Sequence, residues 1–131
     1  MNCAVNGTTV NAVSDSDVLI DWLQGRPEAK TVFSEYDRVL LSKITWMEVL
    51  VGFRTPEQDA TARRSLSQFD VIAISDAIAE EAIAIRRAQR LKIADALIFA
   101  TARVSGCVLL TRNTRDFDAN DPGVRIPYRL G

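Results

Sequence analysis

Acidic side chains recur just after the segments that the sequence predicts to be buried strands. In chain order these residues are Asp15, Asp17, Glu48 and Asp116. Asp95 joins them if the helix that it begins points its amino end at the same place, because the helix dipole stabilises a carboxylate there. The working cleft of a parallel sheet lies beyond the carboxyl ends of its strands. We therefore expect these acids, which are far apart in the chain, to converge.

Converging carboxylates need compensation, because two full charges about 4 Å apart repel each other by roughly 4 kcal/mol at an effective dielectric constant of 20. Either proton uptake or a divalent cation must balance the cluster. The sequence has no histidine, and its two cysteines, Cys3 and Cys107, form no C-x-x-C zinc motif. An all-oxygen site suits Mg²⁺ or Mn²⁺ better than Zn²⁺. Such an ion activates water and stabilises charge on a phosphodiester, so metal-dependent hydrolysis is the leading hypothesis.

The composition excludes other classes of protein. Without histidine, neither a Ser-His-acid triad nor histidine-pair ribonuclease chemistry is available. The 131 residues, 47% hydrophobic and 25% charged, predict one soluble domain spanning 1–131. The net charge of −1 means that nucleic-acid binding would require a local basic patch. The chain has no long apolar stretch and does not begin like a secretory signal, so we expect a cytoplasmic protein without membrane association.

Each acid also has a structural interpretation. Thr45 and Glu48 match the S/T-x-x-E capping box, in which the glutamate returns a hydrogen bond to the backbone of the capping residue. Asp95 would stabilise the first turn of a helix without binding anything else. Aspartates such as Asp15 and Asp116 are common in turns. Only their joint placement at successive strand ends favours a shared site.

The pattern of apolar residues predicts strands that alternate with helices. The predicted strands are 8–14, 39–42, 71–74, 107–111 and 124–126, and the predicted helices are 15–25, 27–36, 76–90 and 94–105, with further helix starts at Thr45 and Thr55. Strands joined by helical crossovers form a mostly parallel sheet with helices on both faces. The fold class is therefore α/β, a three-layer α/β/α sandwich with a mostly parallel central sheet.

Four sequence blocks resemble the successive blocks of the PIN-domain nucleases. They are DSDVLIDWL at 15–23, ITWMEVLVG at 44–52, DALIFATA at 95–102 and TRNTRDF at 111–117. Each block alone is weak, but the four occur in the family's order across nearly the whole chain. Their spacing and the chain length are most similar to the short VapC-type toxins of bacterial and archaeal toxin–antitoxin pairs.

This resemblance implies a PIN-like fold and a Mg²⁺- or Mn²⁺-dependent endoribonuclease, with an RNA substrate, a cognate antitoxin that blocks the cleft, and a homodimer. The family's catalytic and metal-binding acids fall here on Asp15, Glu48, Asp95 and Asp116, and its supporting polar positions fall on Ser16, Thr111 and Asn113. We expect the three aspartates to hold one ion, and Glu48 to orient or deprotonate the attacking water and to share any second ion. The sequence departs from the family at Asp17, where asparagine is more frequent, and at Phe99, where alanine is frequent.

Two basic groups flank the predicted acids. Arg86, Arg90 and Lys92 precede Asp95, and Arg112 and Arg115 lie near Asp116. These five cations are candidates for contacts with the RNA backbone. The first group also has a structural interpretation, because cations stabilise the last turn of a helix. Arg86 and Arg90 are, however, a like-charged i,i+4 pair, which is mildly unfavourable unless an anion lies between them.

Two other functions fit part of the sequence. Asp15-Ser16-Asp17 resembles the D-x-D motif of the haloacid-dehalogenase phosphatases, in which the first aspartate is a nucleophile. That fold requires a longer chain and a further pair of acids. A non-enzymatic receiver domain has a similar length and an acid pair at its start, but Ser42 and Lys43 stand where its phosphate-accepting aspartate is expected.

Overall fold

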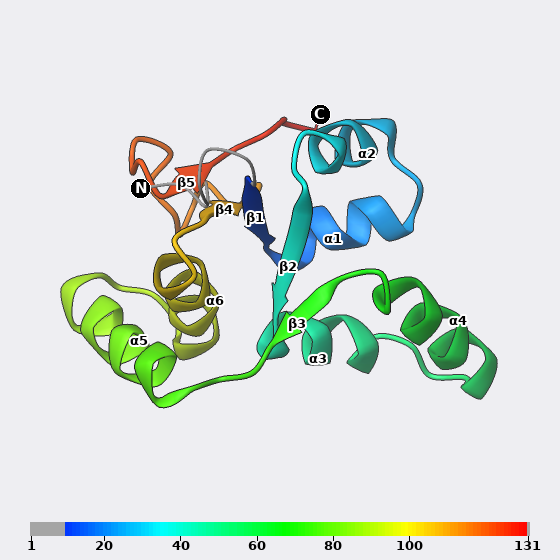
Figure 1. The fold of residues 1–131 in the computed structure, drawn as a ribbon, viewed down its shortest axis with the longest axis horizontal. Coiled ribbons are helices and arrows are strands. Elements are labelled where there is room, and N and C mark those ends of the chain that lie inside the picture. Colours follow the sequence, from blue (N-terminus) through cyan, green and yellow to red (C-terminus); the bar gives the residue numbers. More distant parts are fainter. Residues whose placement is uncertain (1–9, 131) are drawn as a thin grey trace.

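The computed structural model describes residues 10–130, which form one parallel sheet covered by helices (Figure 1). The strands are β1 (Asn11–Ser14), β2 (Arg38–Ser42), β3 (Asp70–Ile72), β4 (Val108–Leu110) and β5 (Val124–Arg125). Their order in the sheet is β3-β2-β1-β4-β5, and every pair is parallel. The predicted parallel sheet is thus confirmed. Residues 8 and 9 of the predicted first strand lie outside the described residues.

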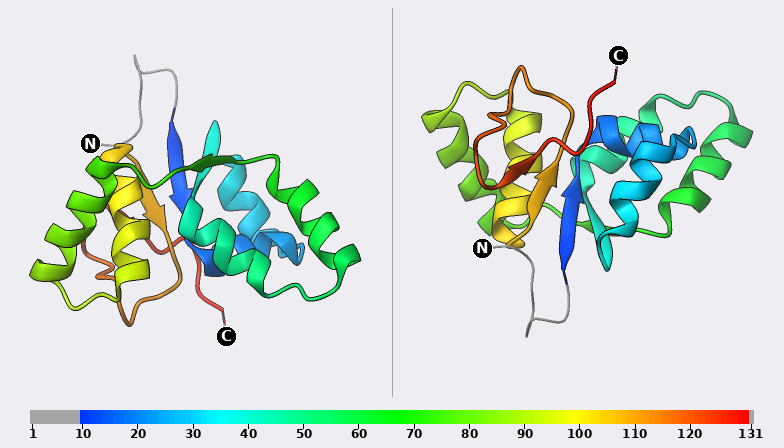
Figure 2. Two further views of the ribbon diagram at one scale, coloured as in Figure 1. Left: turned by 90° about the horizontal axis from the view of Figure 1, so that it is seen from below. Right: turned by 90° about the horizontal axis from the view of Figure 1, so that it is seen from above.

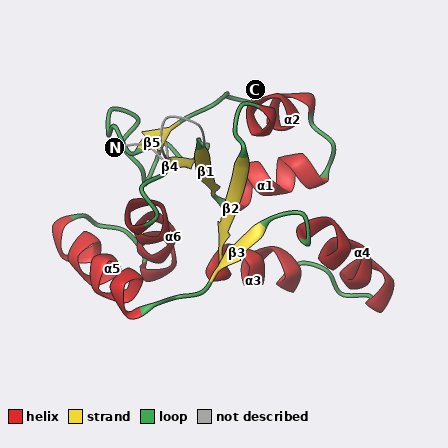
Figure 3. Cartoon of the chain, viewed as in Figure 1, coloured by secondary structure: helices red, strands yellow, loops and turns green. Residues whose placement is uncertain are grey.

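The helices follow the strands in the predicted alternation (Figure 3). They are α1 (Ser16–Leu23), α2 (Pro27–Ser34), α3 (Lys43–Val51), α4 (Pro56–Leu66), α5 (Asp76–Ala88) and α6 (Ile93–Val104). Because each crossover returns the chain to the same edge of the sheet, β1, β2 and β4 all end on one side of the molecule. The residues that follow these three strands are therefore brought to one edge.

Hydrophobic side chains on the strands alternate between two cores, one on each face of the sheet. Val13, Leu40 and Leu109 face the core covered by α5 and α6, whereas Leu41 and Leu110 face the core covered by α1 to α4. Figure 2 shows these two groups of helices on opposite sides of the strands. Burial on both faces is typical of a parallel sheet, and the three-layer α/β/α architecture is confirmed.

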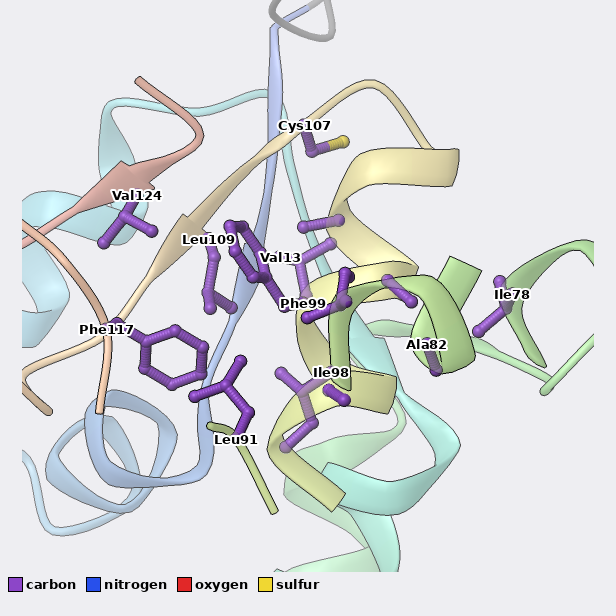
Figure 4. Close-up of a cluster of buried hydrophobic side chains, with 14 of the residues drawn as sticks. Val13, Ile78, Ala82, Leu91, Ile98, Phe99, Cys107, Leu109, Phe117 and Val124 are labelled. Carbon is purple, nitrogen blue, oxygen red and sulfur yellow. The ribbon is translucent and has the colours of Figure 1, made fainter. Parts of the chain in front are cut away.

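The core beneath α6 also holds the loop that follows β4 (Figure 4). Phe99 of α6 packs edge to face against Phe117 of this loop, with ring centroids 5.6 Å apart. Both side chains are 1% exposed. This aromatic pair anchors the loop against the helix that carries Asp95.

Helix caps follow the sequence in two places and depart from it in one. Thr55 caps α4 through the N–H of Gln58, at the predicted helix start, and Ser75 caps α5, which begins at the predicted residue 76. The capping box of Thr45 and Glu48 is wrong, because Ser42 caps α3 and Thr45 lies within the helix. The helix begins directly after β2, so the residue that ends the strand also supplies the cap.

None of the helices in the described part of the chain is long and apolar enough to cross a membrane.

Candidate active site

Asp15 occupies the junction between β1 and α1. Its backbone N–H donates to the carbonyl of Leu110 at 2.8 Å, which fixes it against the end of β4. Its Oδ1 accepts a hydrogen bond from the N–H of Ser16 at 2.7 Å, and its Oδ2 accepts one from the hydroxyl of Thr111 at 2.7 Å. The residue is only 6% exposed. Asp15 is therefore a buried carboxylate held in one orientation by groups from two strand ends.

Glu48 is connected to Asp15 through Ser16. It lies on α3, where its side chain is exposed, and its Oε1 accepts a hydrogen bond from the Ser16 hydroxyl at 2.7 Å. Ser16 thus contacts Asp15 through its backbone and Glu48 through its side chain. This bond directs the glutamate of α3 towards the end of β1.

Asp116 is linked to the same site from the loop after β4. Asn113 and Asp116 form two hydrogen bonds: Nδ2 of Asn113 donates to Oδ2 of Asp116 at 2.9 Å, and the N–H of Asp116 donates to Oδ1 of Asn113 at 3.1 Å. The N–H of Asn113 in turn donates to the Thr111 hydroxyl at 3.0 Å. A continuous series of hydrogen bonds therefore runs from Asp116 through Asn113 and Thr111 to Asp15.

Asp95 lies in the first turn of α6 and is partly buried. Burial raises its pKa, and the negative charges of Asp116 and Glu48 raise it further. These interactions indicate that the three acids share one region of negative potential. The positive charge of Lys92 partly offsets the rise in pKa, so this lysine also lies near the site.

The electrostatics of Asp15 are set first by its burial. Burial and the neighbouring charge of Asp17 raise its pKa to about 7, although hydrogen bonds from Thr111 and Ser16 oppose the shift. Asp17 is also pushed towards a higher pKa, mainly by burial. Its carboxylate accepts hydrogen bonds from the N–H groups of Val18 and Arg112. Asp17 therefore supports the loop after β4 and adds negative charge to the site.

The donor atoms suit a hard divalent cation. The site offers carboxylate and hydroxyl oxygens, and its acids destabilise one another's charge in a way that a cation would relieve. Within residues 10–130, however, no three acidic side chains are already close enough to ligate one ion. Ligation of one ion by three of these carboxylates would therefore require side-chain rearrangement, whereas Mg²⁺ is commonly held by one or two carboxylates together with water. The residues fit Mg²⁺ or Mn²⁺ by their chemistry and by their linkage through hydrogen bonds.

The predicted RNA-binding cations occupy two kinds of environment. Arg86 donates a hydrogen bond to the carbonyl of Leu91, and Arg112 donates two to Asp21. The other three are exposed and make no side-chain hydrogen bond or ion pair with the described residues; these are Arg90, Lys92 and Arg115. Residues 86–92 line a cavity of about 490 Å³ at the turn between α5 and α6.

Asp21 is a charged residue that the sequence did not single out. It is 3% exposed on the inner face of α1, where Arg112 and Tyr128 both donate hydrogen bonds to it. A signal was available, because an acid three residues after the apolar Val18 falls on the face of the helix that packs against the protein. A buried acid at such a position needs a partner.

The raised pKa of Asp15 predicts how metal-free stability depends on pH. Its folded-state pKa of about 7 lies above the ordinary value of 3.8, so the folded state binds a proton between these values that the unfolded state releases. The contribution of Asp15 to the free energy of unfolding is therefore greatest below about pH 4, and this contribution falls by a few kcal/mol as the pH rises to about 7. Urea unfolding in chelator measures the free energy of unfolding of wild-type and Asp15→Asn protein, and the difference between the two should grow over this pH range. A difference that stays constant with pH would contradict a raised pKa for Asp15.

Comparisons with known proteins agree with this geometry. A PIN domain family model matches residues 12–121, and no curated protein matches the chain. A chain of a toxin–antitoxin complex from Klebsiella pneumoniae is 44% identical, with a TM-score of 0.84 over 91% of this chain and 99% of that chain. A chain of the DNA-bound VapBC complex from Salmonella typhimurium is 25% identical, with a TM-score of 0.75 over 88% and 95%. A chain of FitAcB from Neisseria gonorrhoeae, 23% identical with a TM-score of 0.72 over 91% and 99%, supports the fold. The chain therefore belongs to the PIN-domain family.

Proposed function

We propose that this PIN-domain protein is a divalent-metal-dependent endoribonuclease that acts in the cytoplasm as the toxin of a toxin–antitoxin pair. The observation that carries the proposal is the hydrogen-bond series that links Asp116, Asp15 and Glu48 at the edge where β1 and β4 end. Family membership and the similar toxin–antitoxin complexes support the same function. The series uses the acids and polar residues that the resemblance implied, except Asp95, which makes no hydrogen bond in the series and interacts with Asp116 and Glu48 through charge.

The residues of the site have three roles in the proposed reaction: metal binding, activation of water and positioning of the acids. Asp15, Asp95 and Asp116 would hold Mg²⁺ or Mn²⁺, and the bound ion would supply an activated water and neutralise charge on the phosphodiester. Glu48 would orient the attacking water and accept its proton. The Ser16 hydroxyl, 2.7 Å from Glu48, holds that carboxylate in place. Thr111 and Asn113 orient Asp15 and Asp116 in the same way.

Incubation of the purified protein with total cellular RNA tests this function. We expect discrete cuts in the presence of Mg²⁺ or Mn²⁺ and none in the presence of chelator, with the new ends mapped by sequencing. Asp95→Asn protein is the catalytic control, and it should leave the RNA intact. Cleavage that persists in chelator would contradict metal dependence, and intact RNA with the wild-type protein and Mg²⁺ would contradict the nuclease function.

We further propose that Arg90, Lys92 and Arg115 contact the RNA backbone. They are exposed, and Lys92 is close enough to lower the pKa of Asp95. Replacement of Arg90 by alanine should reduce the slope of log affinity against log salt by about 0.7 for single-stranded RNA, because one phosphate contact is lost. Fluorescence anisotropy with cleavage-deficient protein measures the slope. Arg64→Ala on α4 is the matched control, and an unchanged slope for Arg90→Ala would remove this residue from the RNA path.

The surface of this protein beside Glu48 has hollows that suit the binding of an antitoxin. Two neighbouring cavities of about 340 and 270 Å³ lie between α1, α3 and α4 and share Leu23 and Phe53 in their walls. Glu48 lines the smaller cavity, so a segment bound there would cover a catalytic acid. We propose that the antitoxin inserts an apolar segment at this place and thereby inhibits the enzyme.

A homodimer, implied by the family, would be tested by analytical ultracentrifugation.

The antitoxin of the Klebsiella pneumoniae complex is a practical probe for this surface. Thr61 lines the larger cavity on the exposed side of α4, and Thr61→Arg should weaken binding by at least about tenfold because a charge is placed in an apolar interface. RNA cleavage by the free variant should be unchanged. Equal binding of the variant and the wild-type protein would place the interface elsewhere.

A further inference from the structure

A buried carboxylate on α1 anchors the loop that follows β4. Oδ2 of Asp21 accepts a hydrogen bond from Nε of Arg112 at 2.7 Å, and Oδ1 accepts one from Nη2 of the same arginine at 3.2 Å. Oδ2 also accepts a bond from the hydroxyl of Tyr128 at 2.7 Å. Two parallel bonds between a guanidinium and a carboxylate fix both distance and orientation. Asp21 therefore determines where the arginine side chain lies.

The backbone of Arg112 is held by α1 as well. Its N–H donates to Oδ2 of Asp17 at 3.0 Å, so the residue is fixed at its main chain and at the tip of its side chain. The residues on either side are both parts of the candidate site: Thr111 donates to Asp15, and Asn113 bonds to Asp116. A shift of Arg112 would consequently move the groups that orient two of the acids.

We propose that Asp21 is a positioning residue of the nuclease site, and that it acts by holding Arg112 so that the loop of residues 111–116 presents Asp116 to the other acids. The catalytic part of this inference rests on the proposed function. This proposal gives Arg112 a different role from the RNA contact expected from the sequence. The guanidinium group of Arg112 is already bound to Asp21, which is 3% exposed. If Arg112 moved away, Asp21 would keep only the Tyr128 hydroxyl and a longer ion pair with Arg26, at 3.7 Å. A buried carboxylate that loses its closest cation is unfavourable, which keeps Arg112 in this position.

Tyr128 extends the same network to the end of the described chain. Its hydroxyl donates to Asp21, and burial, followed by this hydrogen bond and the charge of Asp21, raises the pKa of Tyr128 well above its usual range. The segment after β5 is therefore tied to the carboxylate that holds the loop. Loss of this bond alone removes one of the three donors to Asp21 and should loosen the loop less than loss of the carboxylate.

Two variants separate positioning from RNA binding because both keep a cation at position 112. Arg112→Lys retains the charge but loses the two-pronged contact with Asp21, and Asp21→Asn retains Arg112 itself. We expect either change to lower kcat by about 10- to 100-fold and to raise the Mg²⁺ concentration needed for half-maximal activity, with KM for RNA and the salt dependence of binding unchanged. If Arg112 bound phosphate instead, both variants would keep nearly wild-type kcat, and that result would overturn the inference.

Hydrogen exchange gives a readout that needs no RNA. In the metal-free protein, Asp21→Asn and Arg112→Lys should increase amide exchange by at least about tenfold in residues 111–117 while the strands β1 and β4 remain protected. Tyr128→Phe should have a smaller effect of the same kind and serves if Asp21→Asn folds poorly. Glu35→Gln, which removes an exposed ion pair with Arg125, is the matched control. Unchanged exchange in residues 111–117 would contradict positioning, whereas inactive wild-type protein with altered exchange in the variants would refute only the nuclease function.

Discussion

Replacement of Asp15 by asparagine is expected to reduce RNA cleavage by at least about a hundredfold and to stabilise the metal-free protein at pH 8. Asp15 would hold the ion that stabilises charge in the transition state, and loss of one such electrostatic contribution typically costs about 10²- to 10³-fold in rate. The stability gain has a different cause: the wild-type carboxylate is 6% exposed and has a pKa of about 7, so at pH 8 it is ionised where burial opposes ionisation. The measurements are initial cleavage rates at saturating Mg²⁺ and urea unfolding in chelator.

Asparagine can keep the hydrogen-bond contacts of Asp15, so the substitution removes mainly the negative charge. Asparagine retains an oxygen that can accept from the N–H of Ser16, and its amide group can meet the Thr111 hydroxyl that now donates to Asp15. Asp76→Asn in the exposed first turn of α5 is the control, and it should alter neither property. Near-wild-type cleavage by the Asp15 variant would remove Asp15 from the catalytic site. Lower stability at pH 8 in chelator would show that its charge is compensated in the folded state.

Replacement of Phe99 by alanine, the residue that the family often has at this position, is expected to destabilise the protein by about 3 to 5 kcal/mol. Phe99 is 1% exposed and contacts Phe117 edge to face. A Cβ atom added at Gly123 would lie 3.5 Å from the Phe99 ring, so the chain passes close to the ring on another side. Alanine would therefore leave a cavity that the surrounding backbone cannot easily fill.

Equilibrium unfolding in urea tests this second prediction at constant pH and salt. Val104→Ala on the same helix is the matched control, because Val104 is 47% exposed and its truncation creates no internal cavity. The control should change the free energy of unfolding by less than about 1 kcal/mol. If Phe99→Ala lowered the free energy of unfolding by as little as the control does, the core under α6 would have collapsed to fill the space. That result would contradict the close packing inferred for Phe99.

The fold could be predicted from the sequence because its main signals are local. Apolar runs such as 39–42 mark strands buried on both faces, and Thr55 with Pro56 marks a helix start. The three-layer arrangement then follows from the alternation of strands and helices. The candidate acids were identified from similarly local signals, because Asp15 directly follows a buried strand, and the other acids either come a few residues after one or begin a helix.

The remaining details depend on which distant residues meet. The structural interpretation of Glu48 paired it with Thr45 in a capping box, whereas the structure gives it Ser16 as its partner, 32 positions away. Arg112 looked like a surface cation, but its partner Asp21 is 91 positions away. Whether a charged side chain binds a ligand or another residue is decided by such long-range pairs, which propensity and periodicity do not encode.

The most direct test of the central claim, that acids from separate parts of the chain form one cation site, is the anomalous scattering of Mn²⁺ in crystals of the full chain grown at about pH 8. We predict an Mn²⁺ peak within about 2 to 2.5 Å of carboxylate oxygens of Asp15 and at least one of Asp95 and Asp116, and no peak there in Asp15→Asn crystals. Bound Mn²⁺ found only at other carboxylates, in protein that cleaves RNA, would contradict the account.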